Sequence, residues 1–456
     1  MKQRIILTVA CLAIFFETLD VSVLNMAIPQ MELYFSAGPD GIQWVQTVYV
    51  LCYAGFVLLG GRLADTNGRR RIFVSGALLF AAASLAAGFS VSFAWLLTCR
   101  AFQGIGVAMA IPAAIAIITN TFPNPVERNR ALGVFGAMAG IGFATGLATG
   151  GIISKVLGWQ WVFFINVPVI AVAVILALRY IPADERNKRT SRNIWSGVMI
   201  AILMLLASWL IHSIGSIGRN PLLFGILLAV SGILGYYFVK RESVHPSPLV
   251  DFKLFRLPGV ITGNLGAFLS GSVFLSYIFL LTLYLQQELH FSSATAGLLL
   301  FPFSILSGLT SKYLLPRLLQ RFGVVKTGII GNSFMLSGIL FFLLSNYMGH
   351  SLVFLFFAVL CLNSVGISII YPCVTILSVQ STPEAQHGLA SGISATSGSF
   401  GNGMGLSVIG VVMRLCEQQH WNIYGAGLIT LTILAVLAIV PLISFCYLRP
   451  EAPEAL

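Results

Sequence analysis

Long runs of apolar residues, separated by short polar segments, follow one another along almost the whole chain. They lie at residues 5–28, 42–61, 72–90, 94–119, 131–154, 161–180, 194–214, 221–239, 260–286, 294–316, 326–346, 352–378, 388–413 and 423–447. Each run is long enough to cross a hydrocarbon core of about 30 Å as a helix. Open strands would leave backbone groups without hydrogen bonds in lipid. The pattern therefore predicts an all-α membrane protein with fourteen spans.

The composition fits a lipid environment and excludes an ordinary water-soluble domain. Hydrophobic residues make up 57% of the 456 residues and charged residues only 9%, against about 25% charged in a typical soluble domain. Fourteen spans leave no length for a soluble catalytic domain. The seven cysteines have no CxxC spacing, and the six histidines have no metal-ligand spacing. We therefore expect no enzyme activity, no cofactor and no metal site.

The positive net charge, +11, is explained by membrane topology. When the N-terminus is placed in the cytoplasm, all but four of the 26 basic residues fall in cytoplasmic segments, most of them in 62–71, 179–192, 240–256 and 312–326. The four exceptions are Arg100, Lys155, Arg219 and Arg414. This asymmetry follows the positive-inside rule. It predicts a multi-pass protein of the cell inner (plasma) membrane with both termini cytoplasmic. We expect a monomer whose basic loops meet lipid headgroups, not nucleic acid.

Two long cytoplasmic loops, 181–193 and 240–258, flank the seventh and eighth spans. They predict an N-terminal six-helix bundle (residues 1–181), an inserted helix pair with its flanking loops (182–258) and a C-terminal six-helix bundle (259–456).

Three ionisable side chains remain deep inside predicted spans: Glu17, Asp20 and Arg100. Charges inside a membrane are costly and usually face a cavity or a partner. At 1.5 Å per residue, Asp20 lies roughly 12 Å and Arg100 roughly 9 Å from the outer ends of their spans, so the two can pair. Glu17 and Asp20 share one helical face, and two carboxylates this close cannot both ionise easily in a low dielectric. They are candidates for proton coupling, with Arg100 as tuning or relay group. Purely structural pairing is the alternative, and the sequence leaves open which carboxylate carries the proton.

Other polar residues in the spans suggest a substrate cavity. Gln46, Tyr49 and Tyr53 form a single stripe on the second span. Such residues also serve as hydrogen-bonding links between helices. The complete set of candidates is Asn25, Gln46, Tyr49, Tyr53, Gln103, Asn264, Tyr277, Tyr284, Gln286 and Asn363.

The loop between the second and third spans reads GRLADTNGRRR over residues 61–71. Gly68 permits a left-handed turn, and Asp65 with the arginines can form charge-assisted hydrogen bonds. This sequence resembles the G-x-L-x-D-x-x-G-R-R/K signature of the major facilitator superfamily. The resemblance implies an inner gate that stabilises one state of an alternating-access cycle; a topology signal alone is the alternative. The gate residues are Gly61, Asp65, Gly68, Arg69, Arg70 and Arg71.

Two further motifs are similar to patterns of this family. Residues 96–108 of the fourth span contain Arg100, Gln103 and Gly104, similar to the motif whose arginine is implicated in proton transfer. The fifth span resembles the antiporter motif G-x8-G-x3-G-P-x2-G-G, with Leu147 in the proline position. Its glycines let helices approach closely, and simple packing is the alternative reading. The glycines that carry this resemblance are Gly133, Gly142, Gly146, Gly150 and Gly151.

Two further stretches resemble signatures of one branch of this family, the fourteen-helix drug:proton antiporters. LDVSVLNMAIP at 19–29 looks like its first-span signature, with Ser22 replacing the usual Thr, and WQWVFFINVP at 159–168 is similar to a second, with Gln160 where Arg is common. In the second half only Arg321, Phe322 and Gly323 of the loop motif survive. The resemblance extends from about residue 10 to 410.

The resemblance implies the major facilitator fold: two six-helix bundles plus two extra helices, with a substrate path between the bundles. It implies a proton-coupled exporter of amphipathic compounds. Two carboxylates against one arginine favour cationic drugs as the small-molecule substrate. Export of an endogenous metabolite (an amino acid, a siderophore or a lipid) and a non-transporting membrane sensor on the same scaffold remain alternatives.

Overall fold

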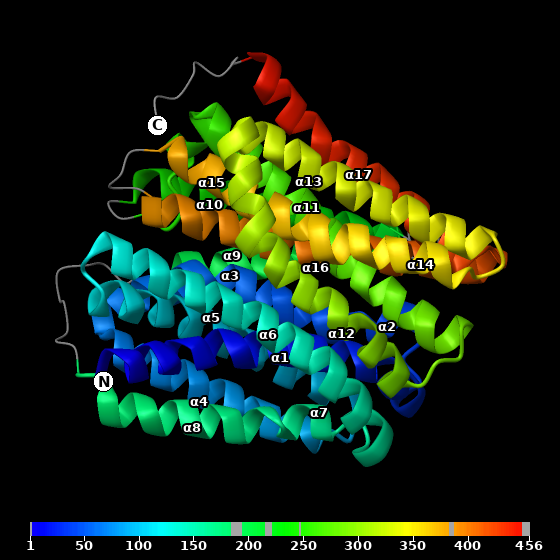
Figure 1. Ribbon diagram of the computed structural model, residues 1–456, viewed down its shortest axis with the longest axis horizontal. Coiled ribbons are helices and arrows are strands. Elements are labelled where there is room, and N and C mark those ends of the chain that lie inside the picture. Colours follow the sequence, from blue (N-terminus) through cyan, green and yellow to red (C-terminus); the bar gives the residue numbers. More distant parts are fainter. Residues whose placement is uncertain (1, 184–193, 215–220, 246–247, 383–386, 449–456) are drawn as a thin grey trace. The chain divides into compact units, whose positions relative to one another are not determined.

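The computed structural model describes residues 2–183, 194–214, 221–245, 248–382 and 387–448. The basic residues at 186–192 and Arg219, used above for topology, lie outside the described residues. The described part is nearly all helical, and Figure 1 shows long helices with short connections. Thirteen described helical runs are long and apolar enough to cross a membrane. One of them, Ser293–Tyr347, has 55 residues and contains both the tenth and the eleventh predicted spans. The prediction of an all-α membrane fold is confirmed.

Packing divides the chain into two compact units. Unit 1 contains Met1–Leu249 and Thr282–Pro302, and unit 2 contains Val250–Leu281 and Phe303–Leu456. The helices of unit 1 before the loop at 184 are α1 (Lys2–Phe35), α2 (Pro39–Ile42), α3 (Trp44–Asn67), α4 (Arg69–Gly88), α5 (Phe93–Thr121), α6 (Pro125–Leu157), α7 (Trp161–Phe164) and α8 (Asn166–Tyr180). They are followed by α9 (Ile194–Ile214) and α10 (Pro221–Val244). The division into a bundle, an inserted pair and a second bundle stays a prediction.

Unit 2 is entered through a 3-10 turn, η1 (Phe252–Arg256), and through α11 (Pro258–Leu283). Three π-helical segments interrupt the later helices of the described part: η2 (Tyr284–Glu288), which lies in unit 1, and η3 (Thr310–Leu314) and η4 (Leu360–Gly366), which lie in unit 2. The helix α12 (Ser293–Leu309) belongs to unit 1 as far as Pro302. The remaining helices of unit 2 are α13 (Leu315–Tyr347), α14 (Leu352–Val359), α15 (Ile367–Gln380), α16 (His387–Gln419) and α17 (Ile423–Leu448). The hydropathy pattern located the spans but not the π segments, because one extra residue in a turn leaves an apolar run unchanged.

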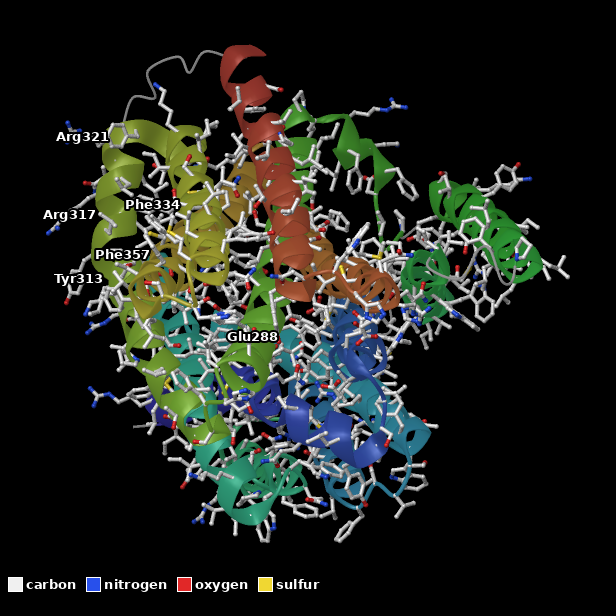
Figure 2. The ribbon with its side chains drawn as sticks, turned by 90° about the vertical axis from the view of Figure 1, so that its right-hand side faces the viewer. Glu288, Tyr313, Arg317, Arg321, Phe334 and Phe357 are labelled. Carbon is white, nitrogen blue, oxygen red and sulfur yellow. The ribbon has the colours of Figure 1, made fainter. Side chains whose placement is uncertain are left out.

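Gly323 breaks the regular geometry of α13. Its φ of 72° lies in the left-handed region that a residue with a Cβ rarely adopts. Figure 2 shows Arg317 and Arg321, just before this break, pointing away from unit 2, and both are exposed. Phe334 and Phe357 are 40% and 41% exposed, as expected for helices that face lipid.

Glycines allow α1 and α6 to pack at very short range, and the two helices lie side by side in Figure 1. A Cβ on Gly142 would meet Thr18 and the Phe15 carbonyl, and one on Gly146 would meet Ser22. A Cβ on Gly150 would lie 2.7 Å from the Cα of Val23. The glycines therefore act at least as a packing surface for α1.

Gly146→Ala is expected to destabilise the protein by about 1–3 kcal/mol, because the added methyl group must push α1 away from α6. Gly140→Ala on the same helix is the matched control, since a Cβ there has nothing within 4 Å among the described residues. It should instead stabilise the helix by about 0.5–1 kcal/mol. Unfolding of the purified variants in mixed micelles measures both. Equal effects of the two substitutions would contradict the close packing.

Candidate functional site

A buried ion pair lies in the interior of unit 1. Asp20 of α1 is 1% exposed and Arg100 of α5 is fully buried. The Nη1 of Arg100 lies 2.6 Å from the Oδ2 of Asp20. The two residues are brought together because they stand at similar depths on neighbouring helices. Ion pairs of this kind are stable only when further hydrogen bonds satisfy the remaining polar atoms.

Those further hydrogen bonds come from three amide and hydroxyl side chains. Arg100 donates through Nη1 to the Oε1 of Gln103 at 2.9 Å. Gln103 and Asn166 donate to the Oδ1 of Asp20 at 3.3 and 2.8 Å. Ser84 of α4 accepts from Gln103 at 3.1 Å and donates to the Phe163 carbonyl at 2.9 Å. The network joins α1, α4, α5 and α8 around one carboxylate.

The second-span helix α3 closes the network around Arg100. The Nε of Arg100 donates to the carbonyl of Val45, a residue of α3, at 2.9 Å. The guanidinium carbon lies 4.1 Å from the ring centroid of Tyr49, a position that stabilises the cation. Tyr49 is 1% exposed. Arg100 therefore has a fixed position and a compensated charge.

Glu17 lies one turn from Asp20 on α1 but takes part in none of the hydrogen bonds described above. It interacts electrostatically with Asp20 and with Tyr49. Unlike Asp20, the side chain keeps part of its surface accessible. Within the described part of the chain, no ion pair or hydrogen bond compensates its carboxylate. The two carboxylates on this face of α1 therefore differ: Asp20 is ion-paired and hydrogen-bonded, and Glu17 is not.

The remaining cavity candidates of unit 1 form a second, smaller group. Gln46 donates to the Oδ1 of Asn25 at 2.7 Å, and Asn25 donates to the Val21 carbonyl at 2.8 Å. Gln286 of η2 donates to the Met26 carbonyl at 3.3 Å, one residue along α1 from Asn25. These three therefore gather at one stretch of α1. Tyr53 is partly accessible, and Tyr284 is fully buried.

The candidates in unit 2 have separate surroundings. Asn264 donates to the Val260 carbonyl at 2.7 Å and to Ser378 at 3.2 Å, and it accepts from Ser397 at 3.0 Å. It therefore links α11, α15 and α16. Tyr277 is fully buried with its ring 5.7 Å from that of Phe342. Asn363 is 5% exposed and lies in the π segment η4.

The loop motif, residues 61–71, joins α3 to α4. Gly68 has a φ of 98°, so the turn needs glycine. Arg70 donates to the Ile181 carbonyl at 3.0 Å, which fastens the start of α4 to the end of α8. Asp65 interacts electrostatically with Arg69 and Arg62. A Cβ on Gly61 would lie 3.5 Å from Pro112 of α5. Arg71 is exposed and lines a cavity of about 280 Å³ beside the loop.

The last residues of the antiporter-like motif contact the start of α12. Ser293 donates to the Gly151 carbonyl at 3.0 Å. A Cβ on Gly297 would collide with the Leu147 carbonyl. Leu147, which stands where the motif has proline, is fully buried. The motif thus packs on α1 with one face and on the 282–302 segment with the other.

Sequence reasoning missed two residues of the Asp20–Arg100 network, Asn166 and Ser84, and one buried carboxylate outside it, Glu242. Asn166 falls inside the 159–168 stretch that resembles a motif of the antiporter branch, and this motif could have marked it as a candidate site residue. Ser84 lies in an alanine-rich stretch of α4 that gives no signal of its own. Glu242 was counted with a cytoplasmic loop, yet it is 1% exposed at the end of α10.

Comparison with known proteins agrees with this architecture. The chain matches the model of the Major Facilitator Superfamily over residues 10–239, 191–406 and 263–456. It is 30% identical over 416 residues to the multidrug resistance protein Stp of Mycobacterium tuberculosis, covering 90% of this chain and 76% of that protein. It is 29% identical over 449 residues to the lincomycin resistance protein of Streptomyces lincolnensis, covering 92% and 88%. The crystal structure of the human organic anion transporter MFSD10 (TETRAN) has a TM-score of 0.65 at 17% identity, covering 96% of this chain and 99% of that one.

The structure and the comparisons place this protein among the multi-pass membrane transporters. The chain belongs to the Major Facilitator Superfamily.

Proposed function

We propose that this protein is a proton-coupled exporter that exchanges inward protons for outward movement of amphipathic, cationic drugs by alternating access. Export of drugs is suggested by the relatives, which include a multidrug resistance protein and a lincomycin resistance protein. The proposal places it in the cell inner membrane with both termini in the cytoplasm, on the distribution of basic residues.

The observation that carries the proton coupling is the contrast between Glu17 and Asp20. Asp20 forms an ion pair with Arg100 and accepts two hydrogen bonds, from Gln103 and Asn166. Glu17 sits on the same face, keeps accessible surface and lacks such partners among the described residues. Protonation of Glu17 removes a like charge beside Asp20 and costs the network nothing. We therefore assign proton uptake to Glu17 and a positioning role to Asp20 and Arg100.

The same charges support a cationic substrate. Arg100 compensates Asp20, so an ionised Glu17 leaves the site with an uncompensated negative charge. A lipophilic cation would be attracted to this charge, and proton binding would release it, which links the two movements. The Tyr49 hydroxyl and the Gln46 Oε1 are buried without hydrogen-bond partners among the described residues, and they offer polar contacts to a substrate. Tyr49 also interacts electrostatically with Glu17.

Three of the proposed cavity residues lie on π-helical segments: Tyr284 and Gln286 on η2 and Asn363 on η4. Such segments are frequent at functional sites because the extra residue redirects side chains and backbone. This supports a role of these three residues in substrate binding. The loop motif at 61–71 is the proposed cytoplasmic gate.

Transport of tetraphenylphosphonium into inverted proteoliposomes tests the proposal. We expect accumulation when the lumen is acidic, and its loss when nigericin collapses the pH gradient. Accumulation that ignores the gradient would overturn proton coupling. If no toxic cation is carried, growth of a deletion strain compared with its metabolite profile separates metabolite export from drug export. Specific binding without any flux would instead indicate a sensor.

A further inference from the structure

The helix α10 carries one buried carboxylate on an otherwise exposed surface. Its buried residues are Leu227, Phe238 and Glu242, whereas Leu222, Ile233 and Tyr236 are largely exposed. Glu242 is 1% exposed. A carboxylate buried at the end of a membrane helix is costly unless it is paired and hydrogen-bonded. Its partners therefore indicate what it does.

Those partners come from three different segments of unit 1. Ser196, at the start of α9, donates to the Oε2 of Glu242 at 2.5 Å. The backbone N–H of Leu249 donates to its Oε1. Arg62, at the start of the loop motif, interacts electrostatically with Glu242 as well as with Asp65. One side chain thus connects α9, the segment after α10 and the loop motif.

The helix α9 does not need Glu242 to stay on α3. Along these two helices, a Cβ on Gly55 would collide with Ala201, and one on Gly197 would lie 2.8 Å from Leu59. At the other end the rings of Trp44 and His212 meet edge to face, with centroids 5.5 Å apart. These contacts fix α9 along the length of α3. The special contribution of Glu242 is therefore its connection of Leu249 to Arg62.

Leu249 is the last residue of unit 1 before the chain enters unit 2 at Val250. We propose that Glu242 is a positioning residue that holds this crossing point of the chain to Arg62 of the loop motif. The inserted helix pair then acts as a connection between the second half of the chain and the cytoplasmic gate, and not as a spacer. The gating consequence rests on the proposed alternating-access function; the structural link does not.

Hydrogen–deuterium exchange of the full-length protein in lipid nanodiscs tests this link. Glu242→Gln should accelerate exchange in residues 61–71 and 248–257 by about tenfold or more, because it leaves Arg62 without its buried counter-charge. Residues 198–212 of α9 should stay unchanged. Arg62→Gln should affect the same two segments, and the double variant should add little to either single change. Glu242→Asp should restore part of the protection.

Glu127→Gln is the matched control, because Glu127 is an exposed acidic residue in the first turn of α6. Unchanged exchange at 61–71 in Glu242→Gln would overturn the proposal, and so would acceleration confined to α9 and α10, which indicates mere docking of the helix pair. If Glu242→Gln fails to fold, Ser196→Ala removes one hydrogen bond only and should give a smaller acceleration in the same two segments. Since exchange requires no substrate, a protein that shows the link but carries no drug would refute the proposed function alone.

Discussion

Arg100→Gln is expected to lower the free energy of unfolding by about 3–5 kcal/mol, because it leaves the buried charge of Asp20 without compensation. It also removes the hydrogen bond to the Val45 carbonyl and the contact with the Tyr49 ring. The loss should therefore exceed that of any single hydrogen bond in the network. Unfolding of the purified variant by SDS in mixed micelles measures it.

Asp20→Asn combined with Arg100→Gln provides the control for this prediction. The double variant no longer contains a buried charge at either position, so it should recover part of the stability that Arg100→Gln loses. Arg128→Gln, at a partly exposed position in the first turns of α6, should change stability little. A double variant that is less stable than Arg100→Gln alone would contradict an uncompensated Asp20 as the cause.

The course of the helices could be predicted closely because the lipid environment demands long apolar runs. The predicted span 194–214 coincides with α9, and 94–119 differs from α5 by one or two residues at each end. The predicted spans 294–316 and 326–346 lie in one helical run, Ser293–Tyr347, and the break at Gly323 falls between them. The π segments were missed, because they depend on packing between helices and not on periodicity.

Part of the candidate site followed from depth counting. Asp20 and Arg100 meet because helices rise by a constant amount per residue, which converts sequence position into depth. The polar candidates were less predictable, because the same amide can line a cavity or link helices. Asn264 makes three hydrogen bonds between helices of unit 2, whereas Gln46 keeps an unpaired Oε1 among the described residues. Only the neighbours distinguish these cases. Glu242 was assigned to a loop because Lys240 and Arg241 precede it, and the sequence gives no sign that the backbone N–H of Leu249 donates to it.

Glu17→Gln is expected to abolish pH-driven accumulation of tetraphenylphosphonium while the protein remains folded. Glutamine is close to glutamate in size but cannot release a proton, so the return step no longer depends on the proton gradient. Exchange of labelled for unlabelled substrate across the membrane needs no net proton movement and should continue. The ratio of pH-driven uptake to exchange in proteoliposomes therefore measures coupling separately from binding.

Asp20→Asn should behave differently, and the difference decides between the two carboxylates. The Asp20 side chain holds Arg100, Gln103 and Asn166 in place, so its neutralisation should reduce uptake and exchange together and lower stability. Glu127→Gln should alter neither activity, since this residue is exposed at the start of α6. If Glu17→Gln keeps full pH-driven uptake while Asp20→Asn loses only that activity, the proton carrier is Asp20, and the engaged carboxylate must leave Arg100 during the cycle. If both variants, and the double variant, transport like the unaltered protein, neither carboxylate couples proton movement to export.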